Sequence, residues 1–209
     1  MVAPEEPKGA DPSADPDVQL MLAFRAGHAA AFDRLFGRWS APLLRHLERM
    51  VRDPATAEEL LQESFLRVFR ARERYEPTAR FSTWLYAIAT NLALNELRRP
   101  RRRAGHRSTE EEPDPDGRTT PLVLEANVPA ADDVAHARRV GADVEAALAA
   151  LPERQRAALL LAAVEGLSYA EVAESLGTTE KSVKALVHRA RVALAEQLEA
   201  RGARDEEAT

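Results

Sequence analysis

The sequence contains no cysteine, and aromatic residues make up only 5% of it. Without cysteine the chain has no disulfide, no thiolate nucleophile and no Cys-based zinc site, which suits a reducing compartment. No apolar run reaches the length of a membrane span, and the polar first residues lack the basic and apolar regions of a signal peptide. We therefore expect a cytoplasmic protein with no membrane span.

Sequence signatures of enzymes are also missing. The histidines (His28, His46, His106, His136 and His188) show no metal-binding spacing, and we interpret them as surface or partly buried residues, with His188 as a possible DNA-facing exception. The chain has no glycine-rich phosphate loop and no nucleophile elbow. We predict that the protein is not an enzyme and has no catalytic residue, metal or cofactor.

Helix-forming residues dominate what is present. Alanine, leucine and arginine are abundant, and they favour helices over strands. The 209 residues suffice for two small domains and a linker. We predict an all-α fold of two small helical domains joined by a flexible linker, the second domain ending in a helix-turn-helix. The predicted segments are a disordered tail 1–16, a first domain 17–100, the linker 101–131, a second domain 132–200 and a fraying tail 201–209.

The second predicted domain carries the pattern of a helix-turn-helix. Ser168 and Glu171 have the spacing of a capping box, so a helix begins there. Gly177 supplies the left-handed residue that ends this helix, and Thr179 caps a second, longer one. A short helix, a turn with glycine and a longer helix are typical of this motif.

The longer helix of the motif has two chemically different faces. Its apolar residues, which predict a buried stripe, are Val183, Leu186, Val187, Ala190 and Leu194. Lys181, Lys184 and His188 lie on the other face, which suits the DNA major groove. The net charge of −5 means that this local basic face, and not the total charge, indicates DNA binding. A merely solvated basic face is the alternative.

The first predicted domain contains a helix with charge at both ends. Asp53-Pro54 is a typical helix start, and the helix extends to about Arg74. Acidic residues fill its first half and arginines its second, which suits the helix dipole or, alternatively, a protein docking surface. Its expected buried stripe is Leu61, Phe65, Val68 and Phe69.

Two further helices complete this domain. The apolar pattern from Phe32 to Val51 predicts one helix with a kink or a restart at Ser40 or Pro42. The other begins with Ser82 as its cap and ends in an arginine-rich run at Pro100. Its expected inward face is Trp84, Leu85, Ile88 and Leu92. Such a basic helix end either binds phosphates or is solvated.

Three segments, in order, resemble the extracytoplasmic-function (ECF) group of the sigma-70 family, the small sigma factors of bacterial RNA polymerase. They are AEELLQESFLRVF, FSTWLYAIATNLALNELRR and LPERQRAALLLAAVEGLSYAEVAESLGTTEKSVKALVHRARVAL. The resemblance implies a non-catalytic transcription initiation factor that joins core RNA polymerase, directs it to promoters and assists strand opening. It also implies an anti-sigma protein as a further partner.

The resemblance assigns residues to each partner. The first domain of such factors binds the β′ coiled coil and the minus-ten element, and the second rests on the β flap and reads the minus-thirty-five element. The implied polymerase-binding residues are Glu58, Glu59, Gln62 and Glu63. The implied minus-ten contacts are Tyr75, Arg80, Phe81, Asn91, Asn95, Arg98 and Arg99. The implied minus-thirty-five contacts are Thr179, Lys181, Ser182, Lys184, Ala185, His188, Arg189 and Arg191.

The sequence departs from the family pattern at two places. Asn95 stands where the family often has aspartate, and Ala185-Leu186 stand where Ser-Arg is common, which removes one expected DNA contact. A stand-alone, dimeric helix-turn-helix regulator is the alternative function. Residues 17–99 distinguish the two, because such a regulator has no need of an acidic docking helix beside a basic one.

Overall fold

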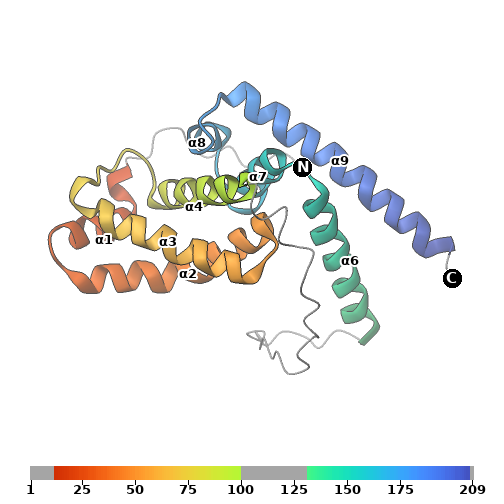
Figure 1. Ribbon diagram of the computed structural model, residues 1–209, viewed down its shortest axis with the longest axis horizontal. Helices are drawn as coiled ribbons and strands as arrows, with labels where there is room; N and C mark the ends of the chain where they lie inside the picture. The colour runs from red at the N-terminus through yellow and green to blue at the C-terminus, as the bar shows by residue number, and fades with distance from the viewer. Residues whose placement is uncertain (1–11, 100–130, 208–209) are drawn as a thin grey trace.

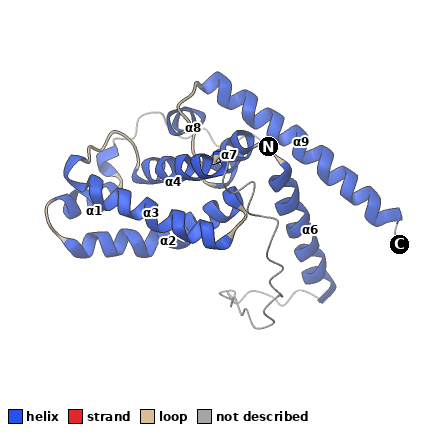
Figure 2. Cartoon of the chain, in the orientation of Figure 1, coloured by secondary structure: helices blue, strands red, loops and turns tan. Residues whose placement is uncertain are grey.

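The computed structural model describes residues 12–99 and 131–207, and this part of the chain consists of helices without any strand (Figure 2). The all-α prediction is confirmed. The first domain comprises η1 (Pro12–Ala14), α1 (Pro16–Arg25), α2 (Ala29–Val51), α3 (Pro54–Ala71), η2 (Arg72–Arg74) and α4 (Phe81–Arg98). The second comprises α6 (Ala131–Ala150), α7 (Glu153–Leu159), η3 (Leu160–Val164), α8 (Tyr169–Ser175) and α9 (Glu180–Glu207). The predicted linker falls, except for Ala131, outside the described residues.

Two helices of the first domain, α1 and α3, begin where an aspartate side chain satisfies a free backbone N–H group. The Asp15 carboxylate accepts from the backbone N–H of Asp17 and starts α1. Asp53 accepts from the N–H of Thr56 and starts α3, with Pro54 at its first position as predicted. Their apolar faces meet α2 and α4 in a core whose largest members include Met21 and Phe81.

Several local predictions about this domain were wrong. Pro12–Ala14 form a turn of 3-10 helix in the segment expected to be disordered, whereas residues 1–11 lie outside the described part. Helix α2 does not restart at Pro42, because the apolar residues on both sides pack into one core and hold the helix through the missing hydrogen bond. Helix α4 begins two residues earlier than expected, with Arg80 and not Ser82 at the cap.

The buried face of α3 includes Phe65 and Val68, as predicted, but differs from the predicted stripe at its other positions. Leu60 and Ser64 are buried, Leu61 is half-buried, and Phe69 is 43% exposed. Ser64 is accommodated because its hydroxyl donates to the carbonyl of Leu60, which makes a polar residue tolerable inside the core. The exposed side of α3 is consequently more apolar than the sequence pattern indicated.

The second domain contains the predicted helix-turn-helix. Ser168 and Glu171 form the capping box of α8, and Gly177 takes a φ of 57° between α8 and α9. Thr179 accepts from the N–H of Ser182 and caps α9. The predicted fraying from residue 201 is wrong, because α9 continues to Glu207. Arg201 supports this extension by pairing with Asp143 of α6 at 3.0 Å.

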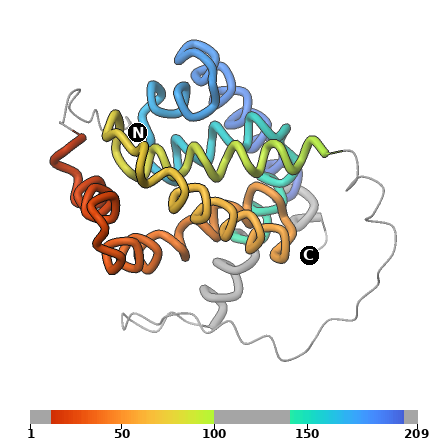
Figure 3. The backbone as a smooth tube through the Cα atoms, turned by 60° about the vertical axis from the view of Figure 1, so that its left-hand side comes forward, coloured from red at the N-terminus to blue at the C-terminus, as the bar shows by residue number. Residues whose placement is uncertain are grey.

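The two domains pack directly on each other. Helix α4 lies between the rest of the first domain and α8, and the views in Figures 1 and 3 agree on this arrangement. Both domains contribute to one continuous apolar core. Helix α4 is therefore buried on most of its circumference, which explains why its sequence shows only a weak division into apolar and polar faces.

Candidate nucleic-acid and polymerase interfaces

The outer face of α9 is basic and accessible. The buried residues of α9 are Val183, Leu186, Val187 and Ala190, as the stripe predicted, with Leu194 half-buried. The residues predicted to contact the minus-thirty-five element are exposed, apart from half-buried Ser182: Thr179, Lys181, Lys184, Ala185, His188, Arg189 and Arg191. Within the described residues no ion pair engages Lys181, Lys184 or Arg189. These cations are available to an anionic ligand.

The exposed face of α3 combines acidic and apolar residues. Glu58, Glu59 and Gln62 are exposed, and half-buried Glu63 pairs with Arg67 at 2.9 Å. One turn further, Leu66 and Phe69 remain 40% and 43% exposed. Sequence analysis missed these two apolar residues as surface candidates. One sequence signal for Leu66 was available: it follows Gln62 by four residues, so the two side chains lie on the same face of the helix.

Phe36 of α2 extends this apolar surface. It is 43% exposed, and its ring centroid lies 4.7 Å from that of Phe65. Phe69 packs edge-on against Phe32 at 5.5 Å, and the Arg72 guanidinium lies 5.3 Å from the Phe69 ring. We call Phe36, Leu66 and Phe69 the α2–α3 apolar patch. Exposed apolar side chains grouped on neighbouring helices mark protein-binding surfaces.

Two of the residues predicted to contact the minus-ten element are part of the core. Phe81 is fully buried, with its ring 5.9 Å from Trp84, and Tyr75 packs on the same tryptophan at 4.9 Å. Burial, with a smaller effect of Asp15, raises the pKa of Tyr75 to about 12. In this structure neither side chain is available to DNA, and both fix the loop between η2 and α4. The assignment of Phe81 and Tyr75 as minus-ten contacts stays a prediction.

The other predicted minus-ten residues lie on α4 or at its start. Some of them contact the second domain, and the others are exposed. Arg80 and Asn91 contact the second domain: Arg80 binds the Glu171 carboxylate, and the Asn91 amide donates to the carbonyl of Ser175 at 2.9 Å. Asn95 and Arg98 are exposed, and exposed Arg99 pairs with Glu96 at 3.1 Å. Helix α8 thus covers one end of the predicted strand path and leaves the other open.

A buried polar cluster also joins the two domains. His46 of α2 is fully buried, with Nε2 3.0 Å from the Thr90 hydroxyl and Nδ1 3.3 Å from the Glu165 carboxylate. Burial alone would raise the pKa of Glu165, but the neighbouring His46 and Tyr86 side chains outweigh it and hold that pKa below its usual value. Burial, reinforced by Glu165, raises the pKa of Tyr86. Nothing in the sequence distinguished His46, because its partner lies in the other domain.

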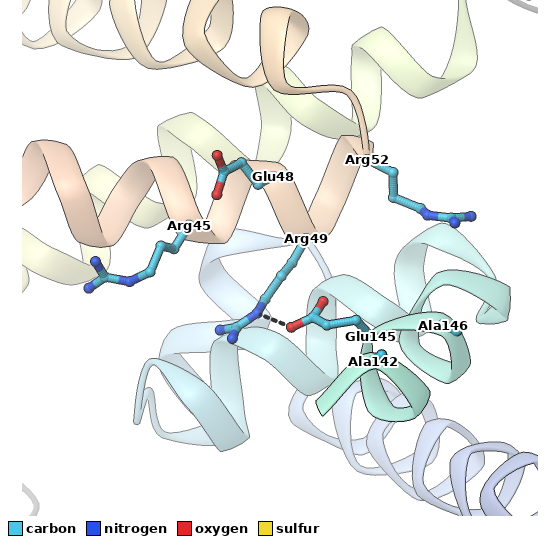
Figure 4. A pocket seen from close by; sticks show the side chains of 7 residues that line it. All are labelled: Arg45, Glu48, Arg49, Arg52, Ala142, Glu145 and Ala146. Carbon is cyan, nitrogen blue, oxygen red and sulfur yellow. Dashed lines mark hydrogen bonds and ion pairs between the residues drawn. The ribbon is translucent and has the colours of Figure 1, made fainter. Parts of the chain in front are cut away.

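An open cleft of about 580 Å³ separates α2 from α6 on another side of the interface (Figure 4). Arg49 crosses it to Glu145 at 2.9 Å, while the side chains of Arg45 and Arg52 extend to opposite ends. The Arg49–Glu145 pair is solvent-exposed, so it stabilises the domain contact only weakly. No group of three or more potential metal ligands occurs in the described part of the chain.

The arrangement defines a class of protein before any comparison is made. A helix-turn-helix presents cations to a duplex, and a separate helical domain presents an acidic and apolar face suited to another protein. Both are features of a DNA-binding protein that also docks on a protein partner.

Comparison with known proteins identifies the family. The family model for sigma-70 region 2 matches residues 35–103, and that for sigma-70 region 4 matches residues 142–194. The ECF RNA polymerase sigma factor SigE of Mycolicibacterium smegmatis is 34% identical over 190 residues, covering 90% of this chain and 70% of the relative. The RNA polymerase sigma factor CarQ of Myxococcus xanthus is 37% identical over 169 residues, covering 81% of this chain and 90% of the relative.

Solved structures share the fold. CnrH in complex with the cytosolic domain of CnrY gives a TM-score of 0.63 at 23% identity, covering 89% of this chain and 99% of that one. The sigma factor RpoE of Bartonella quintana, solved with the anti-sigma factor NepR, gives 0.59 at 22% identity, covering 80% and 96%. At this identity the likeness concerns the fold.

The chain belongs to the sigma-70 family, among its ECF sigma factors. It is a transcription initiation factor that associates with RNA polymerase and confers promoter specificity, in a family without catalysis of its own. The stand-alone regulator is not favoured. Among the described residues, no helix has both the length and the apolar character needed to cross a bilayer.

Proposed function

We propose that the two domains divide the work of initiation between them. The first, residues 17–100, docks on core polymerase and binds the minus-ten element as the strands open. The second, residues 132–200, reads the minus-thirty-five element with α9 and rests on the β flap. The protein itself performs no reaction, and we place it in the cytoplasm, where polymerase and promoter DNA are found.

The observation that carries the proposal for the second domain is the exposed basic face of α9. The turn at Gly177 connects α8 to α9. The buried stripe from Val183 to Ala190 fixes the rotation of α9 about its own axis. Lys184 and Arg189 consequently point away from the domain core, as the recognition helix of a helix-turn-helix requires. Lysine and arginine at such positions bind guanine edges or phosphates.

For the first domain, the exposed face of α3 supports docking on the β′ coiled coil. Its acidic half, with Glu58 and Glu59, supplies charge complementarity, and the α2–α3 apolar patch supplies the buried centre that a stable interface needs. We extend the docking surface beyond the acidic set to include Leu66 and Phe69. Asn95 and Arg98 remain our proposed contacts to the minus-ten strand.

We further propose that an anti-sigma protein binds this factor. The support is the fold shared with RpoE, which was solved bound to the anti-sigma factor NepR.

Run-off transcription with core RNA polymerase tests the function. We expect discrete promoter-specific transcripts only when the protein is present. Lys184→Ala should reduce the yield of these transcripts, because DNA binding loses roughly 1–3 kcal/mol of free energy. The loss should be selective among minus-thirty-five sequences if Lys184 contacts a base, and uniform if it contacts a phosphate. Arg45→Ala, which removes an exposed cation from α2, is the matched control. Equal activity of the two variants would remove Lys184 from the interface.

A further inference from the structure

A carboxylate of the second domain occupies an anion-binding site at the start of α4. The Glu171 Oε1 atom accepts from Arg80 Nε at 3.1 Å, from Arg80 Nη2 at 3.0 Å and from the Thr83 hydroxyl at 2.6 Å. Arg80 Nη2 also donates to Oε2 at 3.0 Å. A guanidinium fork joined by a hydroxyl donor binds phosphate oxygens as well as carboxylate oxygens.

Both donors of this site belong to the first domain. Thr83 is 2% exposed, and Arg80 is the cap residue of α4. Both donors therefore sit in the first turn of α4, where the partial positive charge of the helix end also favours an anion. A buried hydroxyl needs a partner, and at Thr83 that partner comes from outside the domain.

Glu171 reaches this site while keeping its local role in α8. Its Oε2 atom accepts from the backbone N–H and the hydroxyl of Ser168, both at 2.8 Å, which completes the capping box. Burial would raise the pKa of Glu171, but the bonds from Thr83, Ser168 and Arg80 outweigh it and lower that pKa. Glu171 is therefore a full negative charge at neutral pH, as a phosphodiester is.

We propose that Arg80 and Thr83 form a phosphodiester-binding site for the melted promoter strand, and that Glu171 fills this site in the free chain as an internal substitute for phosphate. Helix α8 must then leave α4 before the strand is bound, which also releases Asn91 from the carbonyl of Ser175. The inference rests on the proposed assignment of α4 to the minus-ten strand. It adds Thr83, which sequence analysis did not single out, to the residues that contact DNA.

Glu171→Gln tests the substitution directly. Glutamine still completes a capping box, so α8 is retained while the charge that binds Arg80 is lost. Glu174→Gln is the matched control. Glu174 is an exposed residue of the same helix that lines a small cavity with Thr83 and Trp84, and its side chain has no hydrogen bond to the first domain among the described residues. With a fluorescent dT15 oligonucleotide as the probe, we expect E171Q to bind about tenfold more tightly than the wild type. E174Q should stay within about twofold of it.

Domain separation provides an independent readout. Because the sequence has no cysteine, a pair introduced at the exposed positions Arg34 and Val192 can be labelled for energy transfer. We expect lower transfer in E171Q than in E174Q. In the E171Q background, Thr83→Val should remove a measurable part of the gain in dT15 affinity, because the hydroxyl then contacts the strand.

The outcomes separate this inference from the proposed function. If E171Q matches E174Q in both assays, Glu171 does not hold the domains together and the inference is overturned. If the domains separate but dT15 binding is unchanged, Arg80 and Thr83 are not a phosphodiester site. Neither result affects run-off transcription by wild-type protein and core polymerase, whose failure alone would refute the proposed function.

Discussion

Ser168 shows how one side chain sets both a helix start and a domain contact. Its hydroxyl accepts from the N–H of Glu171 at 3.3 Å and donates to the carboxylate that Arg80 binds. Loss of this hydroxyl frees an N–H at the start of α8 and removes a bond that orients Glu171.

We predict that Ser168→Ala lowers the free energy of unfolding by about 1 kcal/mol, measured by urea denaturation. Ser82→Ala is the control, because Ser82 lies within the first turn of α4 without acting as its cap. That change should stay within about 0.5 kcal/mol of the wild type. An equal loss in both variants would show that the capping box contributes nothing particular to stability.

Individual residues were predictable where their partners are close in sequence. Ser168, Glu171 and Gly177 were assigned correctly because a cap and a left-handed turn are properties of a few consecutive residues. His46 and Thr83 were not, because each also pairs with a carboxylate of the second domain, Glu165 and Glu171 respectively. No spacing rule links residues that far apart in the chain.

The α2–α3 apolar patch gives α3 a surface that charge alone does not describe. We predict that Leu66→Asp weakens binding to the β′ coiled coil of core polymerase by at least about tenfold, because a charge then enters the buried centre of the interface. The fold should be retained, since Leu66 is already 40% exposed. A fluorescence titration with the coiled-coil fragment measures the effect.

Val192→Asp is the control for this prediction. Val192 is 44% exposed on α9, so the change has the same chemistry outside the proposed docking surface. If Leu66→Asp binds as tightly as Val192→Asp, the docking surface does not extend beyond the acidic half of α3.

Among the helices, α3, α8 and the start of α9 followed from sequence patterns, and α4 did so only in part. The predicted inward face of α4 included Trp84 and Ile88, which are half-buried, and omitted Thr83 and Thr90, which are buried. Packing against two domains buries two faces of one helix, and a single apolar stripe then no longer predicts which residues are inside.

The contact between the domains is held by polar groups as well as by apolar packing. Glu165 is ionised and nearly buried, and its folded-state pKa lies below the ordinary value of 4.5. A carboxyl whose pKa is lowered on folding stabilises the folded state above its unfolded pKa, and this contribution is lost as pH falls through the folded pKa.

We predict that Glu165→Gln lowers the free energy of unfolding at pH 7 by about 1–3 kcal/mol, and that the difference from wild type shrinks as pH falls below about 4.5. Thermal unfolding between pH 7 and pH 3 measures both effects. Glu145→Gln, at the exposed Arg49 pair, is the control and should change stability by less than about 1 kcal/mol. A difference between wild type and Glu165→Gln that persists undiminished at pH 3 would contradict the assigned role of the Glu165 charge.

The presence of two helical domains was predictable from the sequence, and their packing in one body was not. The expectation of a flexible linker suggested independent domains, whereas Arg80–Glu171 and His46–Glu165 join them across a continuous core. Composition indicates that a segment connects two units, but it carries no information on whether their surfaces are complementary.

Helix α9 has a length that makes it more than a support for its basic residues. Its 28 residues span roughly 42 Å, with Lys181 to Arg191 near one end and the Arg201–Asp143 pair with α6 near the other. Because α9 is this long, a small tilt of the helix at its contact with α6 shifts its other end, where it would meet the DNA groove, by several ångströms. Any ligand that repositions α6 therefore changes the angle at which the promoter is read, without touching a single DNA-binding side chain.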